Sequence, residues 1–466
     1  MKQVMLRVAV AGLFMLALVL VPAGCGGKEE DVWAGGQPQV PDGQTDSAPQ
    51  PTPTPTPTPT PKPSPDQGPL GAKTPIAIAA GAPETPAGAA DGMRTAIVAD
   101  ALGQPHISMD KGDSGTVLLF YDKVGGAWSA SQFNVAAQYN RSVVWTWAPH
   151  MEIDSKDRLW ISALSIGSGA PDSGQDIFIR EGISVNGLSP LNRHWQNAIA
   201  PDFPWEWDSG LVSLDPAYPD QGIGISHNSY WKRFSYDQNA GSLGELEAGQ
   251  IPGVTGGEKT GFYISKAGSV EHASSGSHGV WHAAGHGHNG WDSHYQNSIR
   301  MELKQEPVRF ASYNSFPGMG EDYNWPGVCG DNLNAQVAYI ATDYRNWASG
   351  GTKGIRMNIY NPAINPNEML FSAEQNLVID GSGDNKARRF SPSMAAAKYG
   401  GVFITWMRAD GMVMVKYVGS DGNMLGPEAA VSGGQCPSIA AGPDGNLHLA
   451  YRNGGKIQYR LLTVSY

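Results

Sequence analysis

The sequence predicts an all-β fold, a β-propeller of seven four-stranded blades closed by an N-terminal strand. Two observations indicate this fold. A pattern of three short strands recurs seven times, and the 466 residues include 59 glycines and 34 prolines, as expected of a turn-rich β protein. One repeat is too small to bury both faces of its sheet, whereas repeats stacked around an axis bury them against one another.

The clearest copy of the repeat is the last one in the chain. Ser438–Ala441 is predicted as the first strand, and a Gly-Pro-Asp-Gly turn follows it. Leu447–Arg452 is the second strand, with alternating side chains, and Ile457–Leu462 is the third. We expect the N-terminal part of the chain to supply the fourth strand, from Arg94–Ala99 or otherwise from Thr74–Ala79.

Six further copies precede this one. Their starts are spaced by roughly the 40 to 60 residues expected of a propeller blade with insertions. The first strands are expected to begin near Gln104, Ala148, Ser209, Glu271, Trp325 and Ser391.

Residues 1–24 are predicted to be a targeting segment. Lys2 and Arg7 precede an apolar run, Val8–Val21, which ends shortly before Cys25. This pattern resembles a bacterial lipoprotein signal, and the resemblance implies cleavage before Cys25 and attachment of fatty acyl chains such as palmitate. An ordinary secretory signal is the alternative. We expect a protein of the bacterial cell envelope, lipid-anchored to a membrane and facing the periplasm or the exterior.

Residues 25–72 are predicted to be a disordered stalk, and residues 73–466 the propeller domain. Pro51–Pro61 alternates strictly between proline and threonine, which favours an extended polyproline II spacer of about 3.1 Å per residue. The net charge of −11, without a basic run, argues against a nucleic-acid partner.

From about residue 94 the repeats resemble the sialidase-type (BNR-like) propellers of carbohydrate-active enzymes, and seven-bladed polysaccharide lyases in particular. The resemblance is architectural, because the sialidase Asp-box signature S-x-D-x-G-x-T-W is reduced to a fragment at Ser420–Asn423. It implies a carbohydrate partner and, for a lyase, a His/Tyr catalytic pair.

Three arginines follow the second strand in the fifth, sixth and seventh repeats: Arg345, Arg408 and Arg452. In a propeller these positions open on one face. A guanidinium matches a carboxylate bidentately, so three on one rim suit an acidic sugar. Trp291 and Trp347 also follow strand ends and offer flat apolar faces for sugar rings. Surface arginines that only hydrogen-bond to loops are the alternative.

The histidines are concentrated, with six of the 11 between residues 272 and 294. His106, His150 and His272 are predicted at equivalent places at the start of first strands, where they would face one funnel or pack beneath their loops. The histidines at 286 and 288 project to one side of an extended chain and suit a divalent metal. An exposed turn is the alternative for this pair, His286 and His288, and no cofactor is otherwise required.

These residues indicate a surface-anchored lipoprotein that acts on or binds an acidic polysaccharide or other glycan. As a lyase, it would need a neutralised uronate carboxylate, a base and an acid. The arginines would neutralise the carboxylate. The base would be His272 or His286, and the acid would be Tyr295 or Tyr230. The alternative is a non-catalytic glycan-binding, adhesion or protein-scaffold propeller; a glycoside hydrolase or sialidase is less favoured, because no facing carboxylate pair stands out.

The two other cysteines fall in repeats that are not neighbours. We therefore expect Cys329 and Cys436 to be buried thiols, with a disulfide as the alternative in an exported protein.

Overall fold

The structure is a computed structural model, and contacts divide the chain into two units, Met1–Asp66 and Gln67–Tyr466. Only the second unit is described below, so the predicted signal segment, Cys25 and most of the predicted stalk lie outside the described residues. The structure describes residues 71–86, 94–111, 115–135, 143–167, 174–180, 188–195, 212–214, 220–225, 230–250, 260–264, 281–288, 297–305, 309–315, 321–334, 337–346, 352–361, 363, 379–380, 393–408, 410–421 and 426–466.

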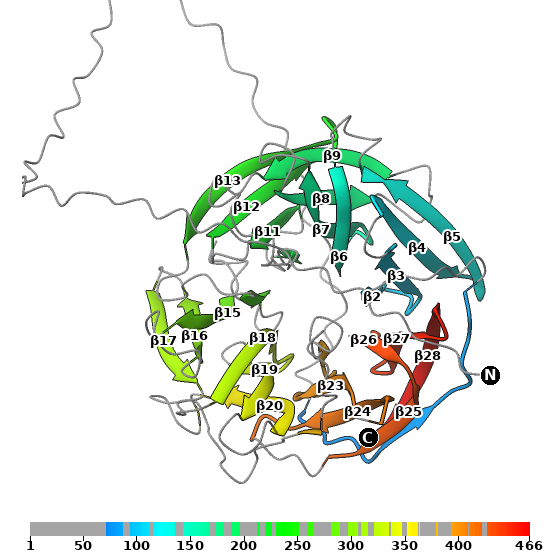
Figure 1. The fold of residues 1–466 in the computed structure, drawn as a ribbon, viewed down its shortest axis with the longest axis vertical. Helices are drawn as coiled ribbons and strands as arrows, with labels where there is room; N and C mark the ends of the chain where they lie inside the picture. The colour runs from blue at the N-terminus through cyan, green and yellow to red at the C-terminus, as the bar shows by residue number, and fades with distance from the viewer. Residues whose placement is uncertain are drawn as a thin grey trace, which may run out of the picture. The chain divides into compact units, whose positions relative to one another are not determined.

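The described part of the second unit forms seven four-stranded antiparallel sheets around one axis (Figure 1). Each first strand contacts the first strands of both neighbouring blades, and these contacts close into a complete ring. The predicted fold is therefore confirmed, down to the number of blades and of strands in each.

The first three blades are formed in chain order. Blade 1 consists of β2 (Thr95–Ala99), β3 (Pro105–Asp110), β4 (Val117–Val124) and β5 (Ala127–Asn134). Blade 2 consists of β6 (Val143–Ile153), β7 (Leu159–Gly167), β8 (Gly174–Arg180) and β9 (Leu188–Trp195). Blade 3 consists of β10 (Val212–Leu214), β11 (Gln221–Ile225), β12 (Tyr230–Asp237) and β13 (Ser242–Gln250).

The last four blades follow, and only the seventh departs from chain order. Blade 4 consists of β14 (Thr260–Ile264), β15 (Trp281–His288), β16 (Asn297–Gln305) and β17 (Arg309–Ser315). Blade 5 consists of β18 (Glu321–Gly330), β19 (Ala338–Asn346), β20 (Thr352–Tyr360) and β21 (Ile379–Asp380). Blade 6 consists of β22 (Ser393–Ala396), β23 (Val402–Met407), β24 (Met412–Val418) and β25 (Glu428–Gly433). Blade 7 consists of β26 (Gln435–Ala441), β27 (Leu447–Asn453), β28 (Lys456–Ser465) and β1 (Ala77–Ala80).

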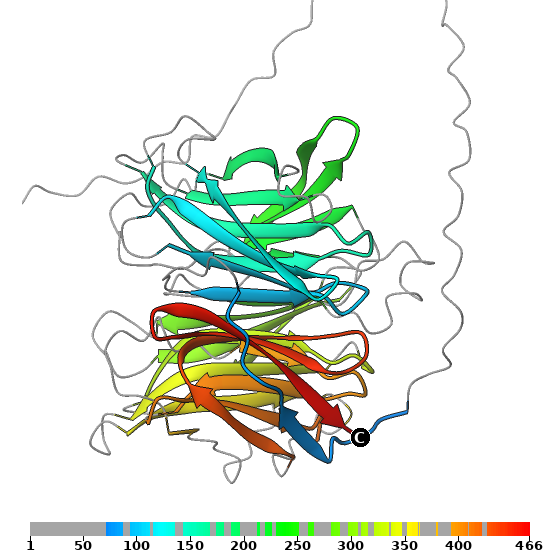
Figure 2. The ribbon, with the colours of Figure 1, turned by 90° about the vertical axis from the view of Figure 1, so that its right-hand side faces the viewer.

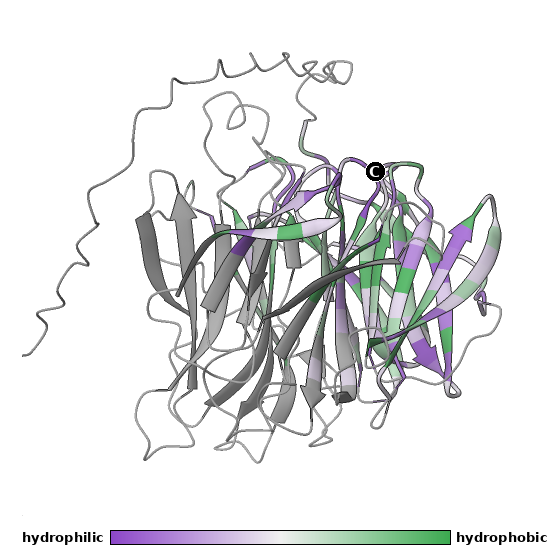
Figure 3. Cartoon of the chain, turned by 90° about the horizontal axis from the view of Figure 1, so that it is seen from above, coloured by the Kyte–Doolittle hydropathy of each residue, from purple (hydrophilic) through white to green (hydrophobic). Residues whose placement is uncertain are grey.

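The core lies in the seams between blades, because alternate side chains of a strand point to opposite faces of its sheet. Ile107 and Met109 of β3 pack towards blade 7, where Tyr459 belongs to the same buried cluster. Leu118 and Phe120 of β4 pack in the other direction, with buried residues of blade 2. Figure 3 shows apolar residues, in green, along the strands that are coloured there, as expected where both faces of a sheet are buried.

The turns between first and second strands explain part of the sequence pattern. Gly103, Gly400 and Gly445 have positive φ values of 74°, 91° and 91° in blades 1, 6 and 7. Blade 2 has Asp157 at the equivalent place, with a φ of 57°. Glycine and, less readily, aspartate tolerate this left-handed conformation, so the recurring turn residues reflect one repeated turn.

The ring closes through β1, which pairs with β28 from Ala77 opposite Ser465 to Ala80 opposite Leu462. Figure 2 shows β1, in blue, beside the red C-terminal strand. The second sequence candidate, Thr74–Ala79, is thus confirmed as the closing segment. The first candidate, Arg94–Ala99, is wrong because Thr95–Ala99 is the innermost strand of blade 1.

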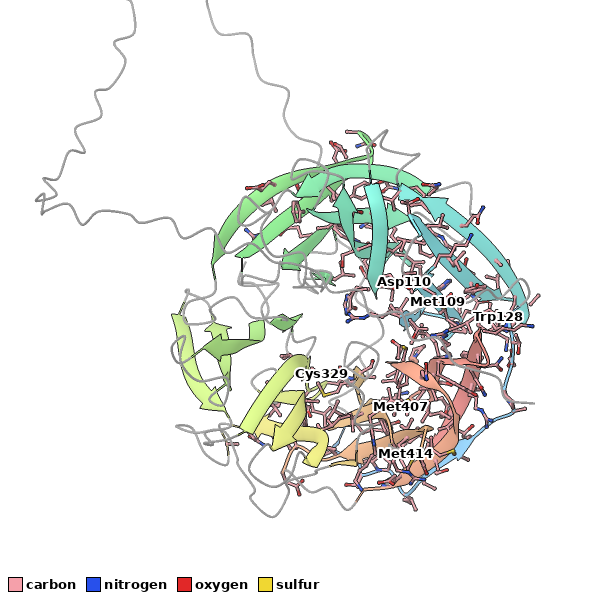
Figure 4. All side chains as sticks on the ribbon, in the orientation of Figure 1. Met109, Asp110, Trp128, Cys329, Met407 and Met414 are labelled. Carbon is pink, nitrogen blue, oxygen red and sulfur yellow. The ribbon has the colours of Figure 1, made fainter. Side chains whose placement is uncertain are left out.

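The chain continues beyond β1 along β28 and reaches blade 1. Glu84 exchanges two backbone hydrogen bonds of 2.9 Å with Tyr459. Its carboxylate then accepts hydrogen bonds from Lys123 Nζ, at 2.7 Å, and from Trp128 Nε1, at 2.8 Å. Trp128 lies at the outer edge of the ring (Figure 4). We call residues 76–85 the strap, because they join the last blade to the first.

Two predicted strand starts are wrong. The segment from Gln104 is the second strand of blade 1, because β2 precedes it. In blade 4 the first strand is β14, Thr260–Ile264, rather than a segment from Glu271. In blade 1 the hairpin of the second and third strands resembles that of the first and second strands, because short antiparallel hairpins look alike in sequence. In blade 4 the predicted second strand agrees with β15, and only the position of the first strand is wrong.

Both described cysteines are buried and form no disulfide, as expected: Cys329 lies on β18 and Cys436 on β26. Among the described residues, no helix has the length and apolar character needed to cross a membrane.

Candidate functional site

The two faces of the ring carry different strand ends and different turns, because neighbouring strands run antiparallel. One face, here called the hairpin face, carries the turns from first to second strands, such as 100–104, 154–158 and 442–446. The opposite face, here called the rim face, carries the ends of second strands and the starts of first strands, and includes the turn 408–412.

Aspartates on the hairpin face hold their own turns together. Asp100 and Asp154 each accept backbone N–H groups two and four residues later, at distances between 2.7 and 2.9 Å. Asp331 accepts the N–H groups of Leu333 and Asn334, two and three residues later, at 2.7 and 3.2 Å. Such side-chain caps are local turn chemistry, so these carboxylates act in folding.

The same carboxylates bind a ring donor at the second position of the following strand. Trp160 Nε1 donates to Asp154 Oδ2 at 3.0 Å, and the Tyr339 hydroxyl donates to Asp331 Oδ2 at 2.7 Å. Blade 6 has alanine in the turn, at Ala397, and Phe403 in the strand, so donor and acceptor are lost together. The carboxylate in the turn and the ring donor in the strand are therefore present together or absent together in these blades.

Hydrogen bonds between turns also join neighbouring blades on the hairpin face. The N–H of Ala101 donates to Asp157, and the guanidinium of Arg158 donates to Asp220 at 2.6 Å. Further on, the N–H of Gly401 donates to Asp331 at 2.7 Å. These polar groups of the hairpin face thus hold neighbouring blades together.

His106 lies beside the hairpin face, at the start of β3, and only 2% of its surface is exposed. Its Nδ1 is 2.7 Å from Asp122 Oδ1, and Arg180 of blade 2 donates to Asp122 Oδ2 at 2.6 Å. The expectation that His106 lines a funnel at the start of a first strand is therefore wrong. It belongs to a buried polar seam between blades 1 and 2.

The carboxylate at the centre of this seam is ionised. Burial would raise the pKa of the Asp122 carboxyl, but hydrogen bonds from His106 and Arg180 and the charge of Arg180 outweigh burial and lower that pKa below its ordinary value. This arrangement neutralises a buried arginine, and it explains the residues without a substrate.

His150 lies on β6, which already begins at Val143, so it is not at the start of its strand. A register shift between Trp147 and His150 precedes it, and it pairs with Ser162 of β7. His106 lies on a second strand and His150 on a first strand, so the expected equivalence of the two histidines is wrong. The third member of the set, His272, lies outside the described residues.

The three predicted arginines do fall at equivalent places on the rim face. Arg345 is the residue before the last of β19, Arg408 directly follows β23, and Arg452 is the residue before the last of β27. These are the second strands of blades 5, 6 and 7, which are consecutive around the ring. The backbone thus brings the arginines to one arc of the rim.

Two glycines show how closely the segments that carry Arg408 and Arg452 approach each other. The N–H of Gly434, just before β26, donates to the carbonyl of Gly411 in the Arg408 turn at 2.8 Å. A Cβ at Gly434 would lie 3.0 Å from the carbonyl oxygen of Arg452 and 2.5 Å from the Tyr451 ring. Glycine is required there, and it lets the two arginine-bearing segments meet.

Arg408 is held by a neighbour that the sequence reading did not single out. Its guanidinium binds Asp410 through Nε, at 3.0 and 3.1 Å, and through Nη2, at 2.6 Å. The hydrogen bonds from Arg408 and from the Met412 N–H hold the pKa of Asp410 below its ordinary value. The Ala-Asp-Gly sequence of this turn was the signal that could have identified Asp410.

Blade 1 places an acid where blades 5 to 7 place arginines. Asp110 ends β3 on the rim face and is fully buried, and its Oδ1 lies 3.4 Å from the backbone nitrogen of Arg94. Figure 4 shows Asp110 nearer the centre of the ring than Trp128. Lys111 directly follows β3, at the place that Arg408 occupies after β23, so the rim end of this strand carries an acid and a cation side by side.

The other predicted site residues are placed only in part. Tyr230 begins β12, and His286 and His288 lie near the end of β15, so all three belong to the rim face, although only their backbone is described. Among the side chains that the structure describes, no group of three or more His, Cys, Asp or Glu forms a metal site. Outside the described residues lie His272, Trp291, Tyr295 and Trp347.

Comparisons with known proteins add no family and no function to the fold described above. No protein-family model matches the chain, and a search of curated proteins finds no match. Among solved structures, a protein of unknown function from Dyadobacter fermentans is 8% identical, with a TM-score of 0.46, over 84% of this chain and 99% of the other.

Two further structures are similar at the same level. The β-propeller domain of the Trilobed protease from Pyrococcus furiosus is 8% identical, with a TM-score of 0.43, over 80% of this chain and 95% of the other. The α-L-arabinanase of Penicillium chrysogenum, solved with arabinobiose, is 9% identical, with a TM-score of 0.41, over 84% of this chain and 98% of the other. At such low identity these matches carry no information about the ligand of this chain.

Proposed function

We propose that this chain is an envelope protein that binds a carboxylate-bearing polysaccharide on its rim face. The observation that supports this proposal is the placement of Arg345, Arg408 and Arg452 at the ends of second strands in three consecutive blades. Successive uronates along a polymer present successive carboxylates, and planar guanidinium forks match them bidentately.

The hairpin face offers no comparable set among the described residues, because its charged groups are bound within and between turns. Asp100, Asp154 and Asp331 all accept backbone N–H groups there. The chain also enters the closing strand on that face, since Ile76 pairs with Ser465 at the end of β28.

The experiment is a binding titration with two polymers that differ only in charge: a polyuronate and the same polymer after reduction of its carboxyl groups. We expect the protein to bind the polyuronate and to lose most of its affinity for the reduced polymer. Arg408→Ala should weaken polyuronate binding about tenfold, which corresponds to a charge-assisted contact of about 1.5 kcal/mol.

Lys398→Ala is the control, because it removes one positive charge from a turn of the hairpin face. Lys398 lies against the Tyr399 ring, 5.6 Å from its centroid, and on the face away from the arginines. Equal losses for Arg408→Ala and Lys398→Ala would mean that net charge, and not the rim, determines binding. Equal affinity for the two polymers would reject the proposal.

The second candidate function is β-elimination at a uronate. The observation that favours it is that His286 and Tyr230 have their backbone on the rim face, in the same ring as the arginines. A lyase would release an unsaturated product that absorbs in the ultraviolet, and His286→Ala would abolish that product while leaving binding nearly intact. Binding without any such product would identify a binding propeller.

A further inference from the structure

We propose that Asp410 is a built-in competitor for the carboxylate site of Arg408, which an acidic sugar has to displace. This inference rests on the function proposed above and concerns the selectivity of the same site. The Asp410 carboxylate forms the fork-to-carboxylate arrangement that a uronate would form, with contacts of 2.6, 3.0 and 3.1 Å to Arg408.

The turn holds Asp410 in this position. The N–H of Arg408 donates to the Met412 carbonyl, and the N–H of Gly411 donates to the Arg408 carbonyl, each at 2.8 Å. Gly411 has a φ of 81°, with no atom within 4 Å of a Cβ placed there. Asp410 Oδ1 also accepts the Met412 N–H at 3.0 Å, so the turn presents the carboxylate to the guanidinium before any ligand arrives.

The contact is weak enough to be displaced. The side chains of Arg408 and Asp410 are 38% and 52% exposed, and exposed ion pairs change an equilibrium constant by about fivefold or less. Asp410 is charged at neutral pH, as an aspartate ordinarily is, and the Arg408 hydrogen bonds lower its pKa further. An isolated carboxylate therefore competes poorly for Arg408, whereas a polymer that engages several arginines at once gains by multivalency.

Selectivity for densely charged polymers follows from this competition. A single acidic residue on a mostly neutral glycan has to displace Asp410 with one contact. A polyuronate that also reaches Arg345 and Arg452 adds contacts to the one that it makes with Arg408.

The experiment measures the affinity of the full chain for a polyuronate and for a monomeric uronate, in the wild type and in Asp410→Asn. The asparagine keeps an oxygen acceptor for the Met412 N–H, so the turn is preserved while the competing charge is lost. We expect both ligands to bind about two- to fivefold more tightly, and we expect the carboxyl-reduced polymer to remain unaffected.

The matched control is Asp444→Asn on the hairpin face. Asp444 also accepts a backbone N–H two residues later, that of Asn446 at 3.0 Å, and its second oxygen accepts the Asn446 side-chain amide at 2.7 Å. The change in net charge is the same, but no arginine of the rim is involved. Asp444→Asn should therefore leave the affinity unchanged.

The possible outcomes distinguish the role of Asp410 as a competitor from the proposed binding of the glycan. If wild type and Asp410→Asn bind the polyuronate equally, or if Asp410→Asn binds more weakly, Asp410 is not a competitor, while the glycan-binding proposal stands. If neither protein binds, both proposals are rejected. An equal gain in Asp410→Asn and Asp444→Asn would attribute the effect to net charge and would overturn the inference.

Discussion

His448, the second residue of β27, is a buried histidine in the seam between blades 7 and 1. Its Nδ1 lies 2.9 Å from the Tyr459 hydroxyl, and 3% of the residue is exposed. Burial lowers its pKa to about 4, an effect that Asp444 and Asp100 oppose and that Lys123 and His106 reinforce. The folded protein therefore holds this imidazole neutral at pH values where the unfolded chain would protonate it.

Acid should destabilise the fold through this residue. Above pH 6.5 the histidine is neutral in both states, and below it the unfolded chain binds a proton that the folded chain takes up only near pH 4. We expect a loss on the order of 3 kcal/mol between pH 7 and pH 4. His448→Gln should lose less over the same range, as urea unfolding at several pH values can measure. Parallel curves for the two proteins would contradict this account.

The buried pair of Asp122 and Arg180 should matter far more to stability than a surface pair. Each side chain is 1% exposed, and removing one partner leaves a buried charge without compensation. We expect Asp122→Asn to cost about 3–5 kcal/mol in the free energy of unfolding. Glu428→Gln, in the more exposed pair with Lys416, should cost about 1 kcal/mol or less. Similar losses of unfolding free energy in the two variants would show that the buried pair contributes no more to stability than the exposed pair.

At the scale of elements, the strap decides whether the ring is closed. A chain that begins at Gly71 keeps β1, whereas a chain that begins at Gly92 leaves the outer edge of β28 unpaired. Unpaired strand edges promote association, and the loss also removes the Glu84 contacts to blade 1. We expect the shorter chain to melt at a markedly lower temperature and to aggregate, as calorimetry and light scattering can measure. Equal melting temperatures would mean that β1 is dispensable.

Much of this fold follows from local signals in the sequence. Gly-Pro-Asp-Gly before Leu447 and the alternation after it predict blade 7 strand by strand, and Thr74–Ala79 was a candidate for the strand that closes it. The strand phase of blade 1 could not be predicted, because any two adjacent strands with a tight turn resemble any other two. The first strand of blade 4 was also placed too late in the chain, although its second strand, β15, was predicted. Which strand is innermost depends on contacts between distant repeats, which local pattern does not encode.

The candidate site was predictable to a similar, partial extent. The spacing of Arg345, Arg408 and Arg452 after second strands was sufficient to place them on one face, because those blades were phased correctly. His106 was misplaced together with its strand. The Asp410 contact depends on a side-chain geometry within one turn, so the sequence suggested a surface arginine there without identifying its partner.

At the scale of the whole molecule, the two faces of the ring carry different sets of charged groups. The hairpin face ties turns to one another and receives the chain from its N-terminal side, where Lys73 donates a backbone hydrogen bond to the Tyr399 carbonyl. The rim face carries the arginines of blades 5 to 7.

The most direct test of this division is the salt dependence of polyuronate binding in a variant lacking all three arginines, Arg345→Ala, Arg408→Ala and Arg452→Ala combined. The wild type should bind more weakly as salt rises, because its contacts are ionic and exposed. The triple variant should bind at least a hundredfold more weakly at low salt, since the loss of one charge-assisted contact weakens binding about tenfold. Its affinity should also depend little on salt, while its melting temperature stays near that of the wild type. A triple variant that binds like the wild type, with the same salt dependence, would contradict the claim that the arginine arc is the binding site.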